Sequence, residues 1–177
     1  SMFAAEMAVC SGRDKEWDVE ISLRLASTAD AVPIALMSRR LVEYGLPSWA
    51  WTPRRVVRQI RHCDSVVLTA RRAEDLVGFS IMYFSTDSAH LNLLAVEPAY
   101  RRLGVGREMV RWLEKTAMTA GSFDVSLEVR ASNGAAVRFY RSLGYQETTR
   151  MLGYYERLED AIRMARDLRI VRIDQPL

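Results

Sequence analysis

Apolar and polar residues near the start of the chain follow first a two-residue period and then a helical one. The odd-numbered positions from Val19 to Leu25 are apolar and those between them are polar, which predicts a half-buried strand. Ser27 or Thr28 then provides an N-cap, so we expect a helix that ends near Val42.

A threonine followed by a proline marks the start of a second helix. Thr52 can cap it and Pro53 suits its first turn, so this helix is expected to reach about Arg61. Three strand-like runs then follow at Ser65–Ala70, Leu76–Phe84 and Ala89–Val96.

The second half of the chain also contains segments with the helical period and segments with the two-residue period. Apolar residues at helical spacing over 104–121 end at Gly121, which predicts a third helix. Alternation over Val125–Val129 indicates another strand, and residues 133–143 form a fourth predicted helix ended by Gly144.

Two further runs, Thr148–Tyr155 and Asp160–Leu168, close the pattern. The first is predicted to be a strand, whereas periodicity alone allows the second to be a strand or a helix. This order of elements predicts an α/β chain with a mixed sheet.

Composition narrows the class of protein. A length of 177 residues with 49% apolar residues suits one globular domain. The net charge is +3. Every Lys or Arg residue other than Lys15 and Lys115 is an arginine, and the arginines are spread along the chain, so we predict no nucleic-acid partner. Cys10 and Cys63 have no metal-type spacing and form no disulfide framework, which predicts a reduced, cytoplasmic protein without a metal.

The ends of the chain carry no predicted element. We expect residues 1–17 to be a flexible tail, 18–168 to be one domain and 169–177 to be a C-terminal extension. The mildly apolar Phe3–Cys10 follows no basic region, so it does not read as a signal peptide. No run approaches the roughly 18 to 20 apolar residues that span a bilayer, and no membrane partner is expected.

The segment 91–107 has the chemistry of an anion cradle. It runs from an apolar strand through a loop with Gly104 and Gly106 into a helix, whose first N–H groups lack intrahelical partners. Arg101 and Arg102 add positive charge beside the glycines. Taken alone, the segment also fits an ordinary turn with glycines that ease packing. It is neither a Walker loop nor a three-glycine dinucleotide fingerprint.

A second segment, Asn133 to Tyr145, completes a recognisable pair. Arg101-Arg102-Leu103-Gly104-Val105-Gly106 resembles the Gln/Arg-x-x-Gly-x-Gly/Ala loop of the GNAT acetyltransferases, and the second segment is similar to their Asn-x-x-Ala-x-x-Phe/Leu-Tyr-x-x-Leu-Gly-Phe/Tyr helix. The resemblance covers about 76–168. Within the superfamily, Leu127–Asn133 is similar to bacterial enzymes that acetylate the N-terminal alanine of a ribosomal protein.

The resemblance implies a single-domain GNAT fold, with a mixed, mostly antiparallel sheet whose central strands splay apart between flanking helices. It favours a strand for Asp160–Leu168. It also implies that acetyl-coenzyme A lies at this splay, with the Val96 N–H polarising the thioester carbonyl. The residues it assigns to the coenzyme are Leu94, Ala95, Val96, Arg101, Arg102, Leu103, Gly104, Val105, Gly106, Arg107 and Asn133.

The resemblance further implies two catalytic side chains. Glu128 is the expected base for the acceptor amine and Tyr140 the expected acid for the departing thiolate. Spacing alone favours a solvent-facing carboxylate for Glu128, paired with Arg130 or another arginine, and it also allows Tyr140 to be a core aromatic. Asn133 is most simply a helix N-cap.

The implied activity is acetyl transfer by direct attack through a tetrahedral intermediate. The expected acceptor is the α-amine of a protein N-terminus, such as that of a ribosomal protein. Alternatives are a small-molecule amine or a lysine, or a coenzyme A sensor without turnover. His90 is expected to be a structural or surface histidine, with a contribution to the acceptor site as the alternative. Trp49 and Trp51 are expected to pack within their loop, where an acceptor wall would form.

Overall fold

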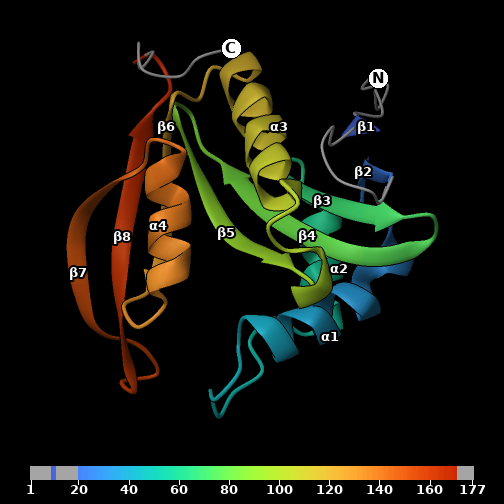
Figure 1. Cartoon of the computed structure of the whole chain (residues 1–177), viewed down its shortest axis with the longest axis horizontal. Coiled ribbons are helices and arrows are strands. Elements are labelled where there is room, and N and C mark those ends of the chain that lie inside the picture. The colour runs from blue at the N-terminus through green and yellow to red at the C-terminus, as the bar shows by residue number, and fades with distance from the viewer. Residues whose placement is uncertain (1–8, 11–19, 171–177) are drawn as a thin grey trace. The chain divides into compact units, whose positions relative to one another are not determined.

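The computed structural model describes residues 9–10 and 20–170, which form strands and helices close to the predicted ones (Figure 1). The strands are β1 (Val9–Cys10), β2 (Ile21–Leu25), β3 (Ser65–Arg72), β4 (Asp75–Phe84), β5 (Ser88–Val96), β6 (Asp124–Arg130), β7 (Gln146–Tyr155) and β8 (Glu159–Asp167). The helices are η1 (Thr28–Asp30), α1 (Ala31–Leu41), α2 (Pro53–Arg61), η2 (Pro98–Tyr100), α3 (Val105–Thr119) and α4 (Gly134–Ser142).

The strands form one mixed sheet in the order β1-β2-β3-β4-β5-β6-β8-β7. β5 and β6 pair in parallel, whereas the pairs β1–β2, β2–β3, β6–β8 and β7–β8 are antiparallel. The predicted fold class is therefore confirmed. The last run is a strand, because seven residues of β6 from Asp124 to Arg130 pair in register with β8.

Most of the predicted tail, residues 1–8 and 11–17, lies outside the described residues, as does 171–177 of the predicted extension. Val9–Cys10 of that tail pairs with Ile21 and Ser22 of β2. The division into tail, domain and extension stays a prediction. In the described part of the chain, no helix is long and apolar enough to cross a membrane.

Residue contacts divide the chain into two compact units. The first comprises residues up to Met82 together with Leu93–Leu113, and the second comprises Tyr83–Asn92 and the chain from Glu114 onward. In the first unit, α1 and α2 bury apolar side chains with β3, β4 and the later half of β5. This core contains Ala31, Ile34, Ala35, Met37, Trp51, Val56, Val67, Phe79, Ile81, Leu93 and Ala95.

A buried carboxylate organises the aromatic loop between α1 and α2. Glu43 is 4% exposed, and its Oε1 accepts hydrogen bonds from the N–H groups of Ala50 at 2.6 Å and Trp51 at 3.1 Å. Its Oε2 accepts the hydroxyl of Ser38 at 2.9 Å. Trp51 is buried beneath the Arg55 guanidinium, which lies 3.9 Å from the ring centre, so loop packing is confirmed for this tryptophan.

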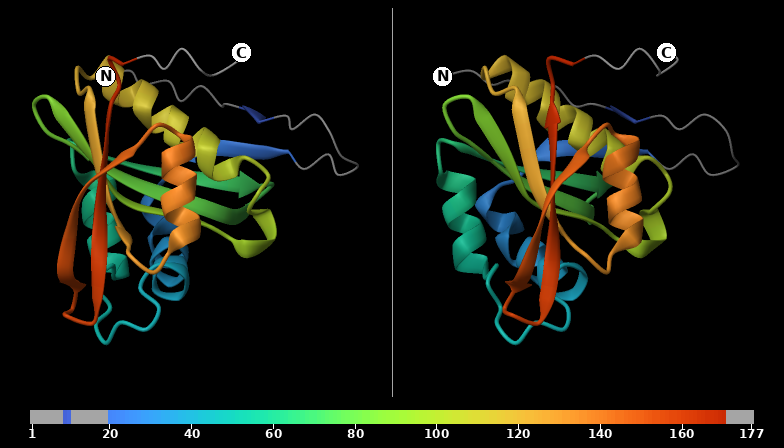
Figure 2. Two further views of the ribbon diagram at one scale, coloured as in Figure 1. Left: turned by 60° about the vertical axis from the view of Figure 1, so that its left-hand side comes forward. Right: turned by 90° about the vertical axis from the view of Figure 1, so that its left-hand side faces the viewer.

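In the second unit, the β7–β8 hairpin pairs with β6, and α4 lies beside these strands (Figure 2). Glu114 anchors the start of β7 to β8: its carboxylate accepts Tyr145 Oη at 2.9 Å and Arg166 Nη1 at 3.0 Å. Because this carboxylate is buried, both partners are needed to offset its desolvation.

We expect Glu43→Ala to lower the free energy of unfolding by about 2–3 kcal/mol, because it leaves the buried Trp51 N–H and Ser38 hydroxyl without their charged acceptor. Denaturant unfolding measures the change. Glu74→Ala is the control, since that side chain is 87% exposed and its loss should cost about 0–1 kcal/mol. Equal effects for the two variants would contradict the anchoring role.

Candidate active site

The predicted anion cradle connects β5 to α3 in the first unit. β5 ends at Val96, η2 follows, and a turn over 101–104 leads into α3. Gly104 has φ +85°, a conformation that glycine adopts without strain, and Arg102 has φ 66°. Residues 101–104 are exposed, whereas Val105 is buried and fixes the helix start.

Polar contacts hold the chain between the end of β5 and this turn. The Glu97 N–H donates to the Val77 carbonyl at 2.8 Å, and Arg40 Nη1 donates to the Glu97 carboxylate at 3.0 Å. The hydrogen bond from Arg40 holds the pKa of Glu97 below its usual range, despite the opposing effect of partial burial. Arg101 Nε donates to the Val96 carbonyl at 2.9 Å.

The residues of the turn fit an anionic group such as a pyrophosphate. A Cβ added to Gly104 would meet nothing within 4 Å, so the space over this backbone is open. The first N–H groups of α3, from Val105 and Gly106, lie at the positive end of the helix. Arg101 and Arg102 add two exposed guanidinium groups to the same turn.

A glycine of β4 supports the strand that leads into the turn. A Cβ at Gly78 would lie 2.9 Å from the Ala95 carbonyl oxygen and 3.5 Å from Val96. Leu94 and Val96 are half-buried, and Ala95 is buried. The close approach therefore fixes the backbone at Ala95 and Val96.

The parallel ladder between β5 and β6 is short. It pairs Ser88–Leu91 with Asp124–Leu127 and includes neither the later half of β5 nor Glu128. This register agrees with the expected splay of the two strands, because the backbone of Leu94, Ala95 and Val96 takes no part in the ladder.

Glu128 lies on β6 in the second unit, where both oxygens of its carboxylate are engaged. Oε1 accepts Arg163 Nη2 at 2.6 Å and Nε at 3.0 Å, and Oε2 lies 2.8 Å from His90 Nε2. The side chain is 6% exposed, so a solvent-facing position is wrong for Glu128. Its arginine partner is Arg163, opposite it on β8, whereas Arg130 pairs with Glu159.

The surroundings favour the ionised form of Glu128. Burial raises the pKa of its carboxyl, but the hydrogen bonds from His90 and Arg163 lower it by more than burial raises it. The resulting pKa lies below the usual range. A buried carboxylate that stays ionised at neutral pH can accept a proton without first losing one.

Tyr140 lies on α4 within an aromatic group of the same unit. Its ring makes edge contacts with Phe139 and Tyr145, at centroid distances of 5.0 and 5.6 Å. Burial raises the pKa of Tyr140 strongly, and nearby Tyr155 adds to the rise. The hydroxyl is therefore protonated at neutral pH. The burial agrees with the alternative of a core aromatic, and the acid role stays a prediction.

Asn133 caps α4, as predicted, because its Oδ1 accepts the Ala136 N–H at 3.0 Å. The side chain is exposed, and the added contact with coenzyme stays a prediction.

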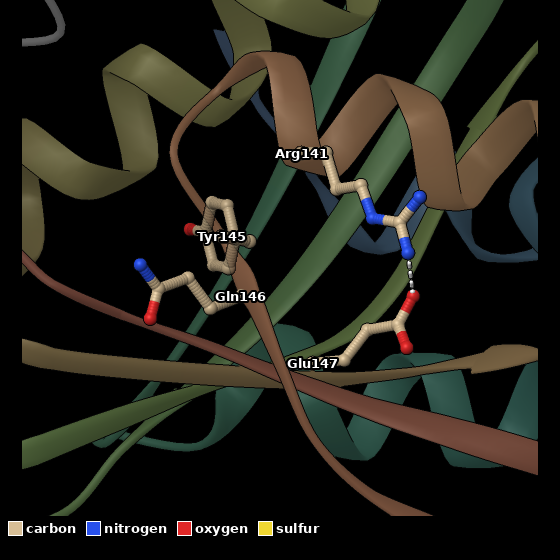
Figure 3. Close-up of a pocket in the computed structure, with 4 residues that line it drawn as sticks. All are labelled: Arg141, Tyr145, Gln146 and Glu147. Carbon is tan, nitrogen blue, oxygen red and sulfur yellow. Dashed lines mark hydrogen bonds and ion pairs between the residues drawn. The ribbon is translucent and has the colours of Figure 1, made fainter.

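A shallow hollow of about 370 Å³ lies elsewhere in the second unit, between the end of α4 and the start of β7 (Figure 3). Its lining residues are Arg141, Tyr145, Gln146 and Glu147, and Arg141 forms an ion pair with Glu147. None of the predicted site residues lines it.

Sequence reasoning missed the two partners of Glu128. His90 is predicted to be structural or at the surface, although it alternates with the buried Ala89 and Leu91 on β5, as Ser126 and Glu128 alternate with the buried residues of β6. That shared alternation is a signal that could have grouped them. Arg163 carried no such signal, because its position opposite Glu128 depends on the register of β8.

We expect Gly78→Ala to lower the free energy of unfolding by about 1–3 kcal/mol, because the new Cβ collides with the Ala95 carbonyl. Denaturant unfolding measures the change, and Gly134→Ala is the matched control. There the Cβ meets only the end of the Arg138 side chain, so this variant should be neutral or slightly more stable. An unchanged free energy of unfolding in Gly78→Ala would show that β5 can shift away from the new Cβ without cost.

Glu128 should also give a pH-dependent contribution to stability. Its folded pKa is lowered, so its contribution is present above the unfolded value of about 4.3 and is lost as pH falls through the folded pKa. The difference in unfolding free energy between the native chain and Glu128→Gln should therefore shrink below about pH 4. Glu74→Gln should show no such trend, and an unchanging difference for Glu128→Gln would refute the ionised state.

Comparison with known proteins supports the GNAT resemblance. The model of the acetyltransferase (GNAT) family matches residues 35–145, which is more than half of the chain. The [ribosomal protein bS18]-alanine N-acetyltransferases of Salmonella typhimurium and Escherichia coli are each 41% identical over 93 residues, which is 51% of this chain and 63% of theirs. The match thus spans slightly less than two thirds of these curated relatives.

Solved structures agree with the fold. The ribosomal-protein-S18-alanine N-acetyltransferase from Escherichia coli superposes with a TM-score of 0.73 at 27% identity, covering 89% of this chain and 99% of that one. Ard1 from Thermoplasma volcanium gives a TM-score of 0.73 at 25% identity, covering 84% and 97%. From the matched family model, the shared fold and the strand–turn–helix sequence of its cradle, the chain belongs to the GNAT acetyltransferase family.

Proposed function

We propose that this protein transfers an acetyl group from acetyl-coenzyme A to the α-amine of a protein N-terminus. The observation that carries the proposal is Glu128, a buried carboxylate held ionised at the first position of β6 beyond the β5 ladder. Such a group suits the removal of a proton from an amine during acyl transfer.

Acetyl-coenzyme A supplies the activated acyl group as a substrate. The N–H groups at the start of α3, with Arg101, Arg102 and Arg107, bind its pyrophosphate, and Asn133 adds a further contact. The backbone of Leu94, Ala95 and Val96 binds the extended pantetheine as an added strand would. The Val96 N–H donates to the thioester carbonyl oxygen, where negative charge develops during attack.

The acceptor assignment rests on basicity and on the named relatives. An α-amine has a pKa of about 7.7–8.0 and a lysine about 10.4, so a larger share of α-amines is neutral and nucleophilic at pH 7. The relatives in Salmonella and Escherichia coli are named for an alanine of ribosomal protein bS18. The catalytic subunit of the N-terminal acetyltransferase B complex of Schizosaccharomyces pombe is 44% identical over 66 residues. We extend to this chain a ribosomal-protein or similar N-terminus as acceptor, and the cytoplasm as its location.

Two side chains handle the protons. Glu128 accepts the proton that the attacking amine loses, directly or through water. Tyr140 donates a proton to the departing thiolate.

Thiol release from acetyl-coenzyme A with a peptide panel tests this function. The peptides differ in their first residues, and polyamines and aminoglycosides are assayed beside them. Turnover on peptides with one class of first residue supports the proposal. Turnover on small amines alone would overturn the acceptor, and coenzyme binding without turnover on any amine would indicate a sensor.

We expect Tyr140→Phe to lower kcat by roughly 10²-fold, because it removes the proton donor and keeps the ring. Calorimetry should give a coenzyme A Kd within about twofold of the native value, since the pyrophosphate and pantetheine contacts assigned above do not involve this hydroxyl. Tyr83→Phe is the control, because Tyr83 is 40% exposed. An unchanged kcat in Tyr140→Phe would remove Tyr140 from the acid role.

A further inference from the structure

We infer that His90 is a positioning residue for Glu128: its imidazole holds the carboxylate ionised and aimed, and Ser126 fixes the orientation of the imidazole. The inference rests on the proposed function, because it assigns His90 a part in the proton transfer that Glu128 performs. All of the groups involved lie in the second unit.

The contacts give each oxygen of Glu128 its own donor. His90 Nε2 lies 2.8 Å from Oε2, and Arg163 donates twice to Oε1. Without His90, Oε2 would keep none of the hydrogen bonds described for it here. Two donors from two neighbouring strands, β5 and β8, thus fix the plane of a carboxylate on β6.

Ser126 is a partner for the second ring nitrogen of His90 in either protonation state of the ring. Its Oγ lies 2.9 Å from His90 Nδ1, on the opposite side of the ring from Glu128. An ionised carboxylate only accepts, so Nε2 must carry hydrogen, and the serine hydroxyl donates to Nδ1 when the ring is neutral. When the ring is protonated, both nitrogens donate and the serine oxygen accepts. Nε2 therefore remains a donor to Glu128 in either state of the ring.

The other groups around Glu128 show why its carboxylate needs the hydrogen bond from His90. From β8, Arg163 is a permanent cation, but its side chain is 44% exposed and thus partly screened. From β7, Tyr154 and Tyr155 lie nearby: burial raises the pKa of each tyrosine, and the Glu128 charge adds to both rises. Neither tyrosine has a described hydrogen bond to the carboxylate. His90 on β5 is therefore the second donor that offsets burial.

Loss of His90 should raise the pH at which Glu128 becomes protonated. Burial would then be opposed by Arg163 alone, and the base would be neutral over more of the acid range. A neutral carboxylic acid cannot accept the amine proton, so catalysis should fall most steeply at low pH. A loss of packing alone would lower activity by the same factor at every pH.

The test compares kcat/KM for His90→Ala with that of the native enzyme between pH 8 and 5.5, on the peptide with the highest turnover. At each pH the kcat/KM of the variant is divided by that of the native enzyme, which removes the titration of the acceptor amine. The ratio should fall by about threefold or more toward low pH, and His90→Gln, which restores an amide donor, should flatten it again. His62→Ala is the matched control, because His62 is the other histidine, is exposed and should give a constant ratio near one.

A ratio for His90→Ala that stays constant with pH would overturn the inference while leaving the proposed function intact. A native enzyme that acetylates no amine would overturn both, and this is seen before any variant is made. If His90→Ala does not fold by thermal melting, Ser126→Ala carries the test. It keeps the imidazole but frees its orientation, so the same trend should appear in weaker form, and a flat ratio would again count against His90.

Discussion

The negative charge of Glu128 is the constraint on which the structure around it depends. Three strands meet at it, since β6 carries the carboxylate and β5 and β8 carry its donors, His90 and Arg163. Burying a carboxylate without such partners would cost several kcal/mol or force it to take up a proton. The pairing of β5 with β6 and of β6 with β8 is therefore also what brings both donors to this carboxylate.

Local pattern was enough to predict the elements and much of the cradle. Alternation located β2 and β6, Thr52-Pro53 located the start of α2, and the glycine-containing loop before α3 was read from its residues alone. β8 was ambiguous because its apolar residues fit two periods. Its pairing with β6 decides the matter, and pairing depends on residues that are distant in the sequence.

The side-chain environment was less accessible to sequence reasoning. Spacing allowed Glu128 to be solvent-facing, since alternation gives a face of the sheet but not what covers that face. Its partners Arg163 and His90 come from other strands, so they follow only from register. Glu43 is a similar case, because a glutamate at the end of a helix is usually exposed to solvent. Its burial under the aromatic loop depends on how that loop folds back.

One peptide that offers two amines gives the most direct test of the central claim, that this GNAT protein acetylates protein N-termini. The peptide begins with alanine and contains an internal lysine, and it is incubated with the protein and acetyl-coenzyme A. Tandem mass spectrometry then locates the added acetyl group. The account predicts acetyl on the α-amine and an unmodified lysine. Acetyl on the lysine side chain, or on neither amine, would contradict it.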